Sequence, residues 1–319
     1  MRKLVVIEPL QPDAYSVLEC RPDIEWNVVD HEPPIRLAAA IADAHALTVR
    51  VGPLTEDILD AAPNLRVISR HGVGYDNVPV EYCTERKIAV AVTANANSTS
   101  VAEHAIHLML SAARAGAEAD SAVRGGNFAI RSRLVGRELC GKTLLVVGYG
   151  RIGQKVAALA EAFGMNVVVH DPYVAIPQPC SHTVAERLED GITSSDIVSL
   201  HLPLTPETKG LLGPAELDLL PESAIVINVS RGGLVDESAL VSRVKEGRLF
   251  GAGLDTFETE PLAADSPLLD EPRIVLSPHS AALTDNSLKA MGILAIRNAI
   301  DGIDGKLNPA MVVNPEVLD

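Results

Sequence analysis

Three glycines, Gly148, Gly150 and Gly153, have the spacing G-x-G-x-x-G between an apolar run and a helical pattern. Gly148 permits a tight turn, Gly150 leaves room for a pyrophosphate to approach the backbone, and Gly153 lets a helix pack close to a strand. Free N–H groups and the positive end of a helix dipole meet at such a turn, which makes an anion site from backbone alone. The spacing therefore predicts a phosphate-binding loop.

The segments around these glycines support a dinucleotide site. Residues 144–147 are an unbroken apolar run that predicts a strand buried on both faces of a parallel sheet, and residues 154–163 have apolar side chains at helical spacing. Residues 166–169 predict a second strand, and Asp171 stands at its end. A carboxylate at this position, roughly 20 residues beyond the glycines, would bind a ribose diol and repel a 2′-phosphate. The prediction is a site for NAD rather than NADP.

Three further side chains, Arg231, Glu260 and His279, follow predicted strands in the same half of the chain. These strands are residues 224–229, 251–255 and 274–276. Functional residues gather in loops beyond the carboxyl ends of parallel strands, so the three side chains can converge although they are far apart in sequence.

An arginine, a carboxylate and an imidazole beside a nicotinamide suit hydride addition to a 2-oxo acid. That reaction needs a cation that orients the carboxylate and polarises the carbonyl, and a proton donor for the developing alkoxide. Arg231 would supply the planar donors and His279 the proton, while Glu260 would stabilise the imidazolium. In the oxidative direction the histidine must be neutral, so alkaline pH should favour oxidation. We expect an oxidoreductase that acts on a CH–OH group.

A second glycine-rich loop, residues 70–77 with the sequence RHGVGYDN, follows directly on the predicted strand at residues 67–69. Backbone N–H groups in such a loop can bind a carboxylate, and Arg70 could add positive charge. The alternative is an ordinary glycine turn with a surface arginine.

Short apolar runs alternate with helical patterns in the first 97 residues. The predicted strands there are residues 4–7, 26–29, 46–49, 67–69 and 88–92, and the predicted helices include residues 35–44 and 55–61. This alternation indicates a parallel sheet covered by helices on both faces. The fold class predicted for the whole chain is therefore α/β, with two Rossmann-like domains.

Residues 98–114 carry the strongest helix pattern, in which Ser100 and Glu103 predict a capping box. His104 and His107 lie on this helix without a third ligand, so we expect packed histidines and no metal site. The helix of residues 284–300 is expected to return to the first domain. The predicted division is a discontinuous substrate-binding domain of residues 1–97 and 286–319 and an NAD-binding domain of residues 98–285.

Composition limits the classes of partner. The chain has 319 residues and a formal charge of −15, which repels nucleic acid and anionic lipid at long range. No segment approaches the length of a membrane span, and Glu8 and Pro9 interrupt the apolar run at the start before a signal peptide could form, so we expect a cytoplasmic protein without membrane partners. The four cysteines form no C-x-x-C pair, and neither a zinc site nor a disulfide framework is expected: Cys20, Cys83, Cys140 and Cys180.

The motifs taken together resemble the D-isomer-specific 2-hydroxyacid dehydrogenase family. In the second half these motifs are GYGRIG, HDP, HLPLTPET, NVSRGGLVDE, DTFETEP and SPHSAA, and in the first half they are RHGVGYDN and TANANSTSVAEH. The resemblance covers nearly the whole chain. It implies a flavodoxin-like substrate domain, a cleft between two Rossmann-like domains, and a homodimer built around the helix that begins at Ser98.

The resemblance also implies roles for individual residues. Arg231, Glu260 and His279 would be catalytic. The substrate would be bound by Arg70, Val73, Gly74, Arg231 and His279. The expected cofactor-binding residues are Thr93, Gly148, Gly150, Arg151, Ile152, Gly153, Asp171, Leu202, Val229, Ser230, Arg231, Asp255, His279, Ala281 and Ala282.

The substrate is less closely defined than the family. Glu260 argues against a formate dehydrogenase, which has glutamine as the partner of the histidine. Arg70 falls where phosphoglycerate dehydrogenases carry an arginine for the substrate phosphate, which favours 3-phosphoglycerate and phosphohydroxypyruvate. Many phosphoglycerate dehydrogenases append a regulatory domain, and because the sequence ends at Asp319 we expect neither that domain nor serine feedback here. The alternatives are a hydroxypyruvate or glyoxylate reductase and, in a different class, an NAD-sensing protein like the transcriptional corepressors that share this fold.

Overall fold

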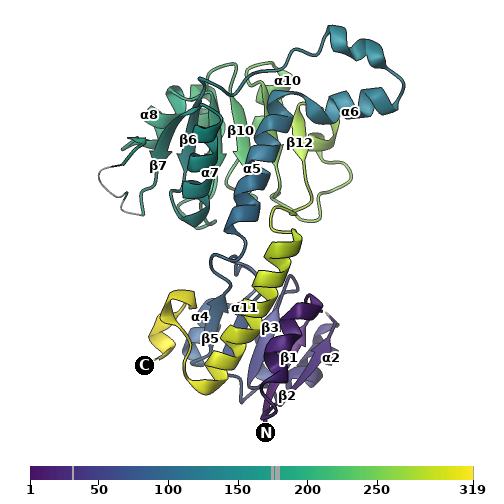
Figure 1. The fold of residues 1–319 in the computed structure, drawn as a ribbon, viewed down its shortest axis with the longest axis vertical. Helices are drawn as coiled ribbons and strands as arrows, with labels where there is room; N and C mark the ends of the chain where they lie inside the picture. Colours follow the sequence, from purple (N-terminus) through teal and green to yellow (C-terminus); the bar gives the residue numbers. More distant parts are fainter. Residues whose placement is uncertain (31, 174–175, 177–179, 319) are drawn as a thin grey trace. The chain divides into compact units, whose positions relative to one another are not determined.

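A computed structural model describes residues 1–30, 32–173, 176 and 180–318 (Figure 1). The chain divides into two compact units: Met1–Asn97 with Leu283–Asp319, and Ser98–Ala282. Both units are α/β, and every strand pair in both sheets is parallel, so the predicted fold class is confirmed. Among the described residues, none of the helices combines the length and the apolar composition that a membrane crossing requires.

The first unit has a five-stranded sheet in the order β2-β1-β3-β4-β5. Its strands are β1 (Arg2–Ile7), β2 (Ile24–Val29), β3 (Ala46–Val49), β4 (Val67–Arg70) and β5 (Ala89–Val92). Its helices are α1 (Ser16–Glu19), α2 (Pro34–Ile41), α3 (Glu56–Asp60), α4 (Val80–Glu85) and α11 (Asp285–Asp304), with short 3-10 turns at Pro12–Tyr15, Pro309–Met311 and Pro315–Leu318.

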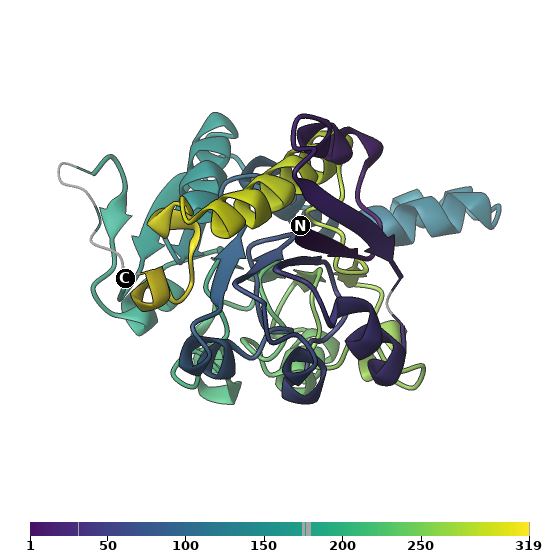
Figure 2. The same ribbon diagram turned by 90° about the horizontal axis from the view of Figure 1, so that it is seen from below.

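Alternating side chains of β1 supply both cores of the first unit. Val5 and Ile7 pack in one cluster with Leu37 of α2, whereas Leu4 packs in another cluster with Ile296 of α11. Successive side chains of a strand point to opposite faces of its sheet, so an unbroken apolar run fits a sheet that is covered on both sides. In Figures 1 and 2, α11 is the yellow helix that lies along one face of this sheet.

The second unit has a seven-stranded sheet in the order β12-β11-β10-β9-β6-β7-β8. Its strands are β6 (Thr143–Val147), β7 (Asn166–His170), β8 (Thr183–Val184), β9 (Ile197–Leu200), β10 (Ile225–Asn228), β11 (Gly251–Leu254) and β12 (Ile274–Leu276). Its helices are α5 (Ser98–Ala113), α6 (Gly116–Arg124), α7 (Arg151–Ala162), α8 (Leu188–Thr193), α9 (Pro214–Leu219) and α10 (Glu237–Lys245), with 3-10 turns at Phe128–Ser132 and Pro267–Asp270.

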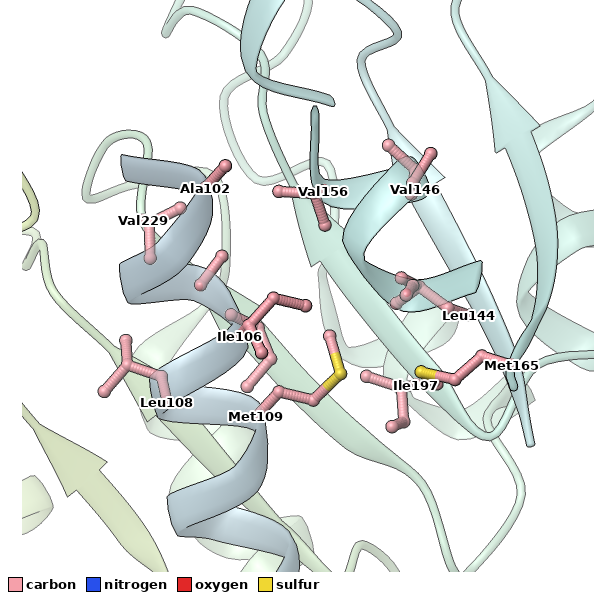
Figure 3. Packing of buried hydrophobic residues seen from close by; sticks show 14 of the residues in the cluster. Ala102, Ile106, Leu108, Met109, Leu144, Val146, Val156, Met165, Ile197 and Val229 are labelled. Carbon is pink, nitrogen blue, oxygen red and sulfur yellow. The ribbon is translucent and has the colours of Figure 1, made fainter. Parts of the chain in front are cut away.

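Helix α5 packs deep into the core of the second unit. Its side chains Ile106, Leu108 and Met109 lie in a buried cluster with Leu144 of β6 (Figure 3). Gly253 of β11 permits this approach, because a Cβ atom there would lie 2.8 Å from the Cβ of Leu108. The helix is therefore fixed directly against the sheet.

The predicted start of α5 at residue 98 is confirmed, but the predicted capping box and the predicted start of α7 were wrong. Helix α5 begins at Ser98, so Ser100 lies inside its first turn and cannot be the N-cap of the predicted capping box. Helix α7 begins at Arg151, three residues before the predicted start, because Gly150 already serves as its N-cap. The short strand β8 was missed, since both of its residues are exposed and give no apolar run.

Candidate active site

The glycine turn joins β6 to α7 in the second unit. Gly148 has a φ of 94°, and a Cβ there would lie 2.7 Å from the backbone of His201. A Cβ on Gly153 would lie 2.0 Å from the carbonyl oxygen of Gly148, whereas a Cβ on Gly150 would meet no atom within 4 Å. Sterics thus require glycine at the first and third positions, while the space beside Gly150 is open at the N-terminus of a 12-residue helix. This geometry fits a pyrophosphate.

Asp171 lies beside this turn. Its Oδ2 accepts a hydrogen bond of 2.7 Å from the N–H of Tyr149, and its Oδ1 accepts one of 2.8 Å from the N–H of Tyr173. The parallel register that pairs Val147 with His170 brings the ends of β6 and β7 to the same edge of the sheet. A carboxylate in this place can accept hydrogen bonds from a ribose diol, so the residues fit NAD.

His279 and Glu260 form a pair in the same unit. The Nδ1 atom of His279 lies 2.8 Å from Oε2 of Glu260, and the other carboxylate oxygen accepts the N–H of Phe257 at 3.0 Å. Because a carboxylate only accepts hydrogen bonds, Nδ1 carries a proton in either form of the ring. Nε2 is then the atom that can gain or lose a proton, and 48% of the histidine side chain is exposed to receive a ligand.

Arg231 lies in the turn after β10, and its neighbour connects it to this pair. A Cβ on Gly232 would lie 1.8 Å from the carbonyl oxygen of Phe257, so the turn packs directly on the loop that leads to Glu260. The backbone of the turn is held by Asn228, whose Nδ2 donates to the carbonyl of Arg231 at 2.7 Å. The structure thus brings the Arg231 turn, Glu260 and His279 into one region at the carboxyl ends of the strands.

The other expected cofactor residues of this unit also follow its strands. Leu202 after β9, Val229 after β10 and Ala281 after β12 are buried, with exposed fractions of 6%, 6% and 4%. The Ser230 hydroxyl donates to the carbonyl of Leu200 at 2.8 Å. Asp255 is completely buried, and its carboxylate is engaged by protein donors.

Thr93 and the expected substrate residues Arg70, Val73 and Gly74 belong to the first unit. Thr93 is fully buried, and its hydroxyl accepts the N–H of Gly72 at 2.8 Å, so it holds the loop of residues 70–77. Arg70, the last residue of β4, folds over this loop and donates from Nη1 to the carbonyl of His71 at 2.7 Å. Among the residues that the structure describes, the N–H groups of Val73 and Gly74 have no acceptor, and two consecutive free N–H groups can bind an anion.

The sequence did not single out Arg50, which follows β3 beside the end of β4. Arg50 and His71 help to line a cavity of about 130 Å³ together with Pro9, Leu10, Gln11 and Leu288. Burial, with the nearby charge of Arg50, lowers the pKa of His71 to about 4, so this imidazole is neutral at pH 7. The signal that could have identified Arg50 is an arginine directly after a buried strand, whereas Arg70 was noticed because it begins a glycine-rich loop.

Glu8 holds the Arg50 loop in place. Its Oε2 accepts the N–H groups of Arg50, Val51 and Gly52 at 3.1, 2.8 and 3.3 Å, and Asn77 donates to the carbonyl of Gly52 at 2.9 Å. Glu8 itself has a φ of 65°, a strained conformation for a residue with a side chain. The strain is maintained because the carboxylate fills a nest of three N–H groups.

The glycine turn with its acid and the Arg–Glu–His group define an NAD-binding α/β protein equipped for acid–base chemistry. The NAD binding domain of the D-isomer specific 2-hydroxyacid dehydrogenases matches residues 106–281. The chain therefore belongs to this family, and its cofactor is NAD.

Individual relatives agree with this assignment. The chain is 40% identical to a D-3-phosphoglycerate dehydrogenase of Methanocaldococcus jannaschii over 99% of this chain, but it spans only 60% of that relative. It is 37% identical to a glyoxylate reductase of Aeropyrum pernix, covering 99% of this chain and 97% of the relative. The crystal structure of the TT0316 protein from Thermus thermophilus superposes with a TM-score of 0.89 at 35% identity, covering 98% of this chain and 99% of the other.

Proposed function

We propose that this chain is an NAD-dependent 2-hydroxyacid dehydrogenase, which catalyses reversible hydride transfer between NADH and a small 2-oxo acid. The observation that carries the proposal is the hydrogen bond of 2.8 Å between His279 and Glu260, in the unit that also holds the glycine turn. A histidine tied to a carboxylate through one ring nitrogen has the other nitrogen ready for proton transfer.

Each side chain has a separate task in the proposed reaction. The glycine turn at residues 148–153 and Asp171 would hold NADH, which would supply the hydride. Arg231 orients the substrate carboxylate and polarises the carbonyl through its planar donors. His279 donates the proton on Nε2 to the carbonyl oxygen, and Glu260 stabilises the imidazolium that makes this donation possible. In the reverse direction, neutral His279 accepts the proton of the substrate hydroxyl.

We propose phosphohydroxypyruvate and 3-phosphoglycerate as the substrate pair. The support comes from the two arginines that follow neighbouring strands, Arg50 and Arg70, and from the free N–H groups of Val73 and Gly74 in the same unit. Guanidinium groups bind phosphate through paired donors, while the N–H groups suit the carboxylate. The name of the Methanocaldococcus relative points the same way.

The second candidate is a glyoxylate or hydroxypyruvate reductase. The chain is 37% identical to the glyoxylate reductase of Aeropyrum pernix, which supports this candidate. For such a substrate, Arg50 and Arg70 would have no phosphate to bind.

We also propose that the protein acts in the cytoplasm as a homodimer. The apolar side of α5 is buried within its own unit, but in the segment of residues 116–135 that follows it several apolar side chains are exposed. None of the residues of α6 is buried, and Val123, Phe128 and Val135 are 54%, 66% and 81% exposed. Figure 1 shows this segment extending away from the other helices of its unit. Apolar side chains in such a protruding segment are suited to a second copy of the chain.

The test is NADH oxidation at neutral pH with phosphohydroxypyruvate, hydroxypyruvate, glyoxylate, pyruvate and oxaloacetate. The proposal expects turnover with a preference for the phosphorylated compound. A preference for hydroxypyruvate or glyoxylate would select the second candidate. No turnover on any of the five would contradict both.

A further inference from the structure

The carboxylate of Asp255, directly after β11, organises the segment that carries His279. It accepts the hydroxyl of Ser277 at 2.6 Å and the N–H groups of Ser280 and Ala281 at 2.9 and 2.8 Å. Burial acts to raise the pKa of Asp255, but hydrogen bonds from His104 and Ser277 outweigh it and hold the pKa below its usual range. A buried anion is thus tied to the residues on both sides of His279.

The backbone at His279 needs this support. Its φ of 49° lies in the left-handed region, which is a strained conformation for a residue with a side chain. The N–H of His279 donates to the carbonyl of Asp255 at 2.8 Å, so the side chain and the main chain of Asp255 both hold the segment. If these bonds were loosened, the backbone could relax and turn the imidazole away from Glu260.

A residue from another element completes this arrangement. The Nε2 atom of His104, on α5, lies 2.8 Å from Oγ of Ser277 and 3.3 Å from Oδ1 of Asp255. The ionised carboxylate can only accept, so Ser277 gives its single proton to Asp255 and its oxygen accepts from His104. The hydrogen bonds therefore run in one direction, from His104 Nε2–H to Ser277 and on to Asp255.

We propose that His104 is a positioning residue for the dehydrogenase reaction, acting through Ser277 and Asp255 to hold the strained backbone that presents His279 to Glu260. The inference rests on the proposed function. Helix α5 can hold His104 in a fixed position because the apolar side chains of the helix are buried in the core of the unit (Figure 3).

Three variants test the proposal by kinetics. His104→Leu removes the donor but retains bulk, His104→Gln restores an N–H donor, and His107→Leu is the matched control, an exposed histidine on the same helix. We expect His104→Leu to lower kcat at least about tenfold, as for a lost hydrogen bond to a charged network, with the KM for NADH changed less than about twofold. His104→Gln should recover most of kcat, and the control should match the parent protein.

A second measurement does not depend on turnover. In ¹H–¹⁵N spectra of the imidazoles, His104 should carry its proton on Nε2, and the Nδ1–H resonance of His279 should shift in His104→Leu but not in the control. If the parent protein turned over no 2-oxo acid, the proposed function would fail while this spectroscopic test of positioning still stood. Unchanged kcat in His104→Leu, or an unchanged His279 resonance, would overturn the positioning role.

Discussion

Glu260 divides its two carboxylate oxygens between a side chain and the backbone: Oε2 lies 2.8 Å from Nδ1 of His279, and Oε1 accepts the N–H of Phe257 at 3.0 Å. The carboxylate is thereby fixed in the loop that packs on the Arg231 turn. Because one oxygen is used for anchoring, the other can hold the imidazole in a single orientation.

Replacing His279 by Ala should lower kcat for reduction by about 100-fold or more, since a general acid contributes about 10²–10⁴ in rate. NADH affinity, measured through NADH fluorescence, should change less than about threefold. Glu260→Gln keeps the size of the side chain but removes the charge, and its single amide oxygen can accept from only one of the two N–H donors, His279 Nδ1–H and Phe257 N–H. Because the general acid itself remains, we expect a smaller loss of about 10- to 100-fold. A large loss of NADH affinity in His279→Ala would mean that the histidine supports the cofactor site instead.

Asp171→Asn should relax the choice of cofactor. The amide oxygen can accept the N–H of either Tyr149 or Tyr173 but not both, and the variant loses the negative charge that repels a 2′-phosphate. We expect the ratio of kcat/KM for NADH over NADPH to fall about tenfold, mostly through weaker NADH binding and better NADPH binding. Asp171→Ala removes the hydrogen-bond acceptor as well as the charge. Comparing the two variants therefore separates the effect of the charge from the effect of the hydrogen bonds that hold the loop. An unchanged ratio in both variants would exclude the carboxylate from cofactor discrimination.

The sequence predicted the fold wherever buried apolar runs ended sharply. Residues 46–49 and 274–276 were predicted as strands and form β3 and β12 with the same limits. A strand that is buried in a parallel sheet appears in the sequence as a short run of apolar residues, so its limits can be predicted from that run. The first turn of α7 was missed because an arginine and a glycine carry no helical apolar pattern, although they stand at a helix N-terminus beside the phosphate loop.

The network of Asp255, Ser277 and His104 is of a different kind. His104 is separated from Asp255 and Ser277 by more than 150 positions in the chain, and only the packing of α5 against the sheet brings it to them. The prediction that His104 is a packed histidine came from a local pattern, and the prediction that Asp255 is a cofactor residue came from the family resemblance. Neither source could predict the hydrogen bonds from His104 to Ser277 and on to Asp255, because these bonds depend on tertiary contacts.

Arg70→Ala and Arg50→Ala should show whether these arginines bind the substrate phosphate or only maintain the shape of their loops. A charge-assisted hydrogen bond contributes about 1.5–3 kcal/mol, so each variant should raise the KM for phosphohydroxypyruvate about 10- to 100-fold. The KM for glyoxylate should change much less, because this substrate has no phosphate. Arg36, an exposed arginine of α2, gives the matched control Arg36→Ala. Equal losses on both substrates would mean that the arginines only support their loops.

Acid should destabilise the first unit through His71. Burial lowers the pKa of this imidazole from 6.5 to about 4. Between these values the unfolded chain binds the proton and the folded chain does not, so the stabilisation is complete above about pH 6.5 and is lost as the pH falls to about 4. At 1.36 kcal/mol per pKa unit, the loss would be about 3 kcal/mol.

Trp26 offers a selective probe for this effect. It is the single tryptophan of the chain, lies on β2 of the same unit and stacks on Tyr15 with ring centroids 5.2 Å apart. Urea unfolding followed by its fluorescence at pH 7, 6 and 5 should show a falling midpoint, and His71→Gln should make that fall shallower even if it lowers the midpoint overall. His107→Gln, in the other unit, should leave the slope unchanged. A parent midpoint that did not move with pH would show that His71 takes up its proton equally well in the folded and unfolded chains.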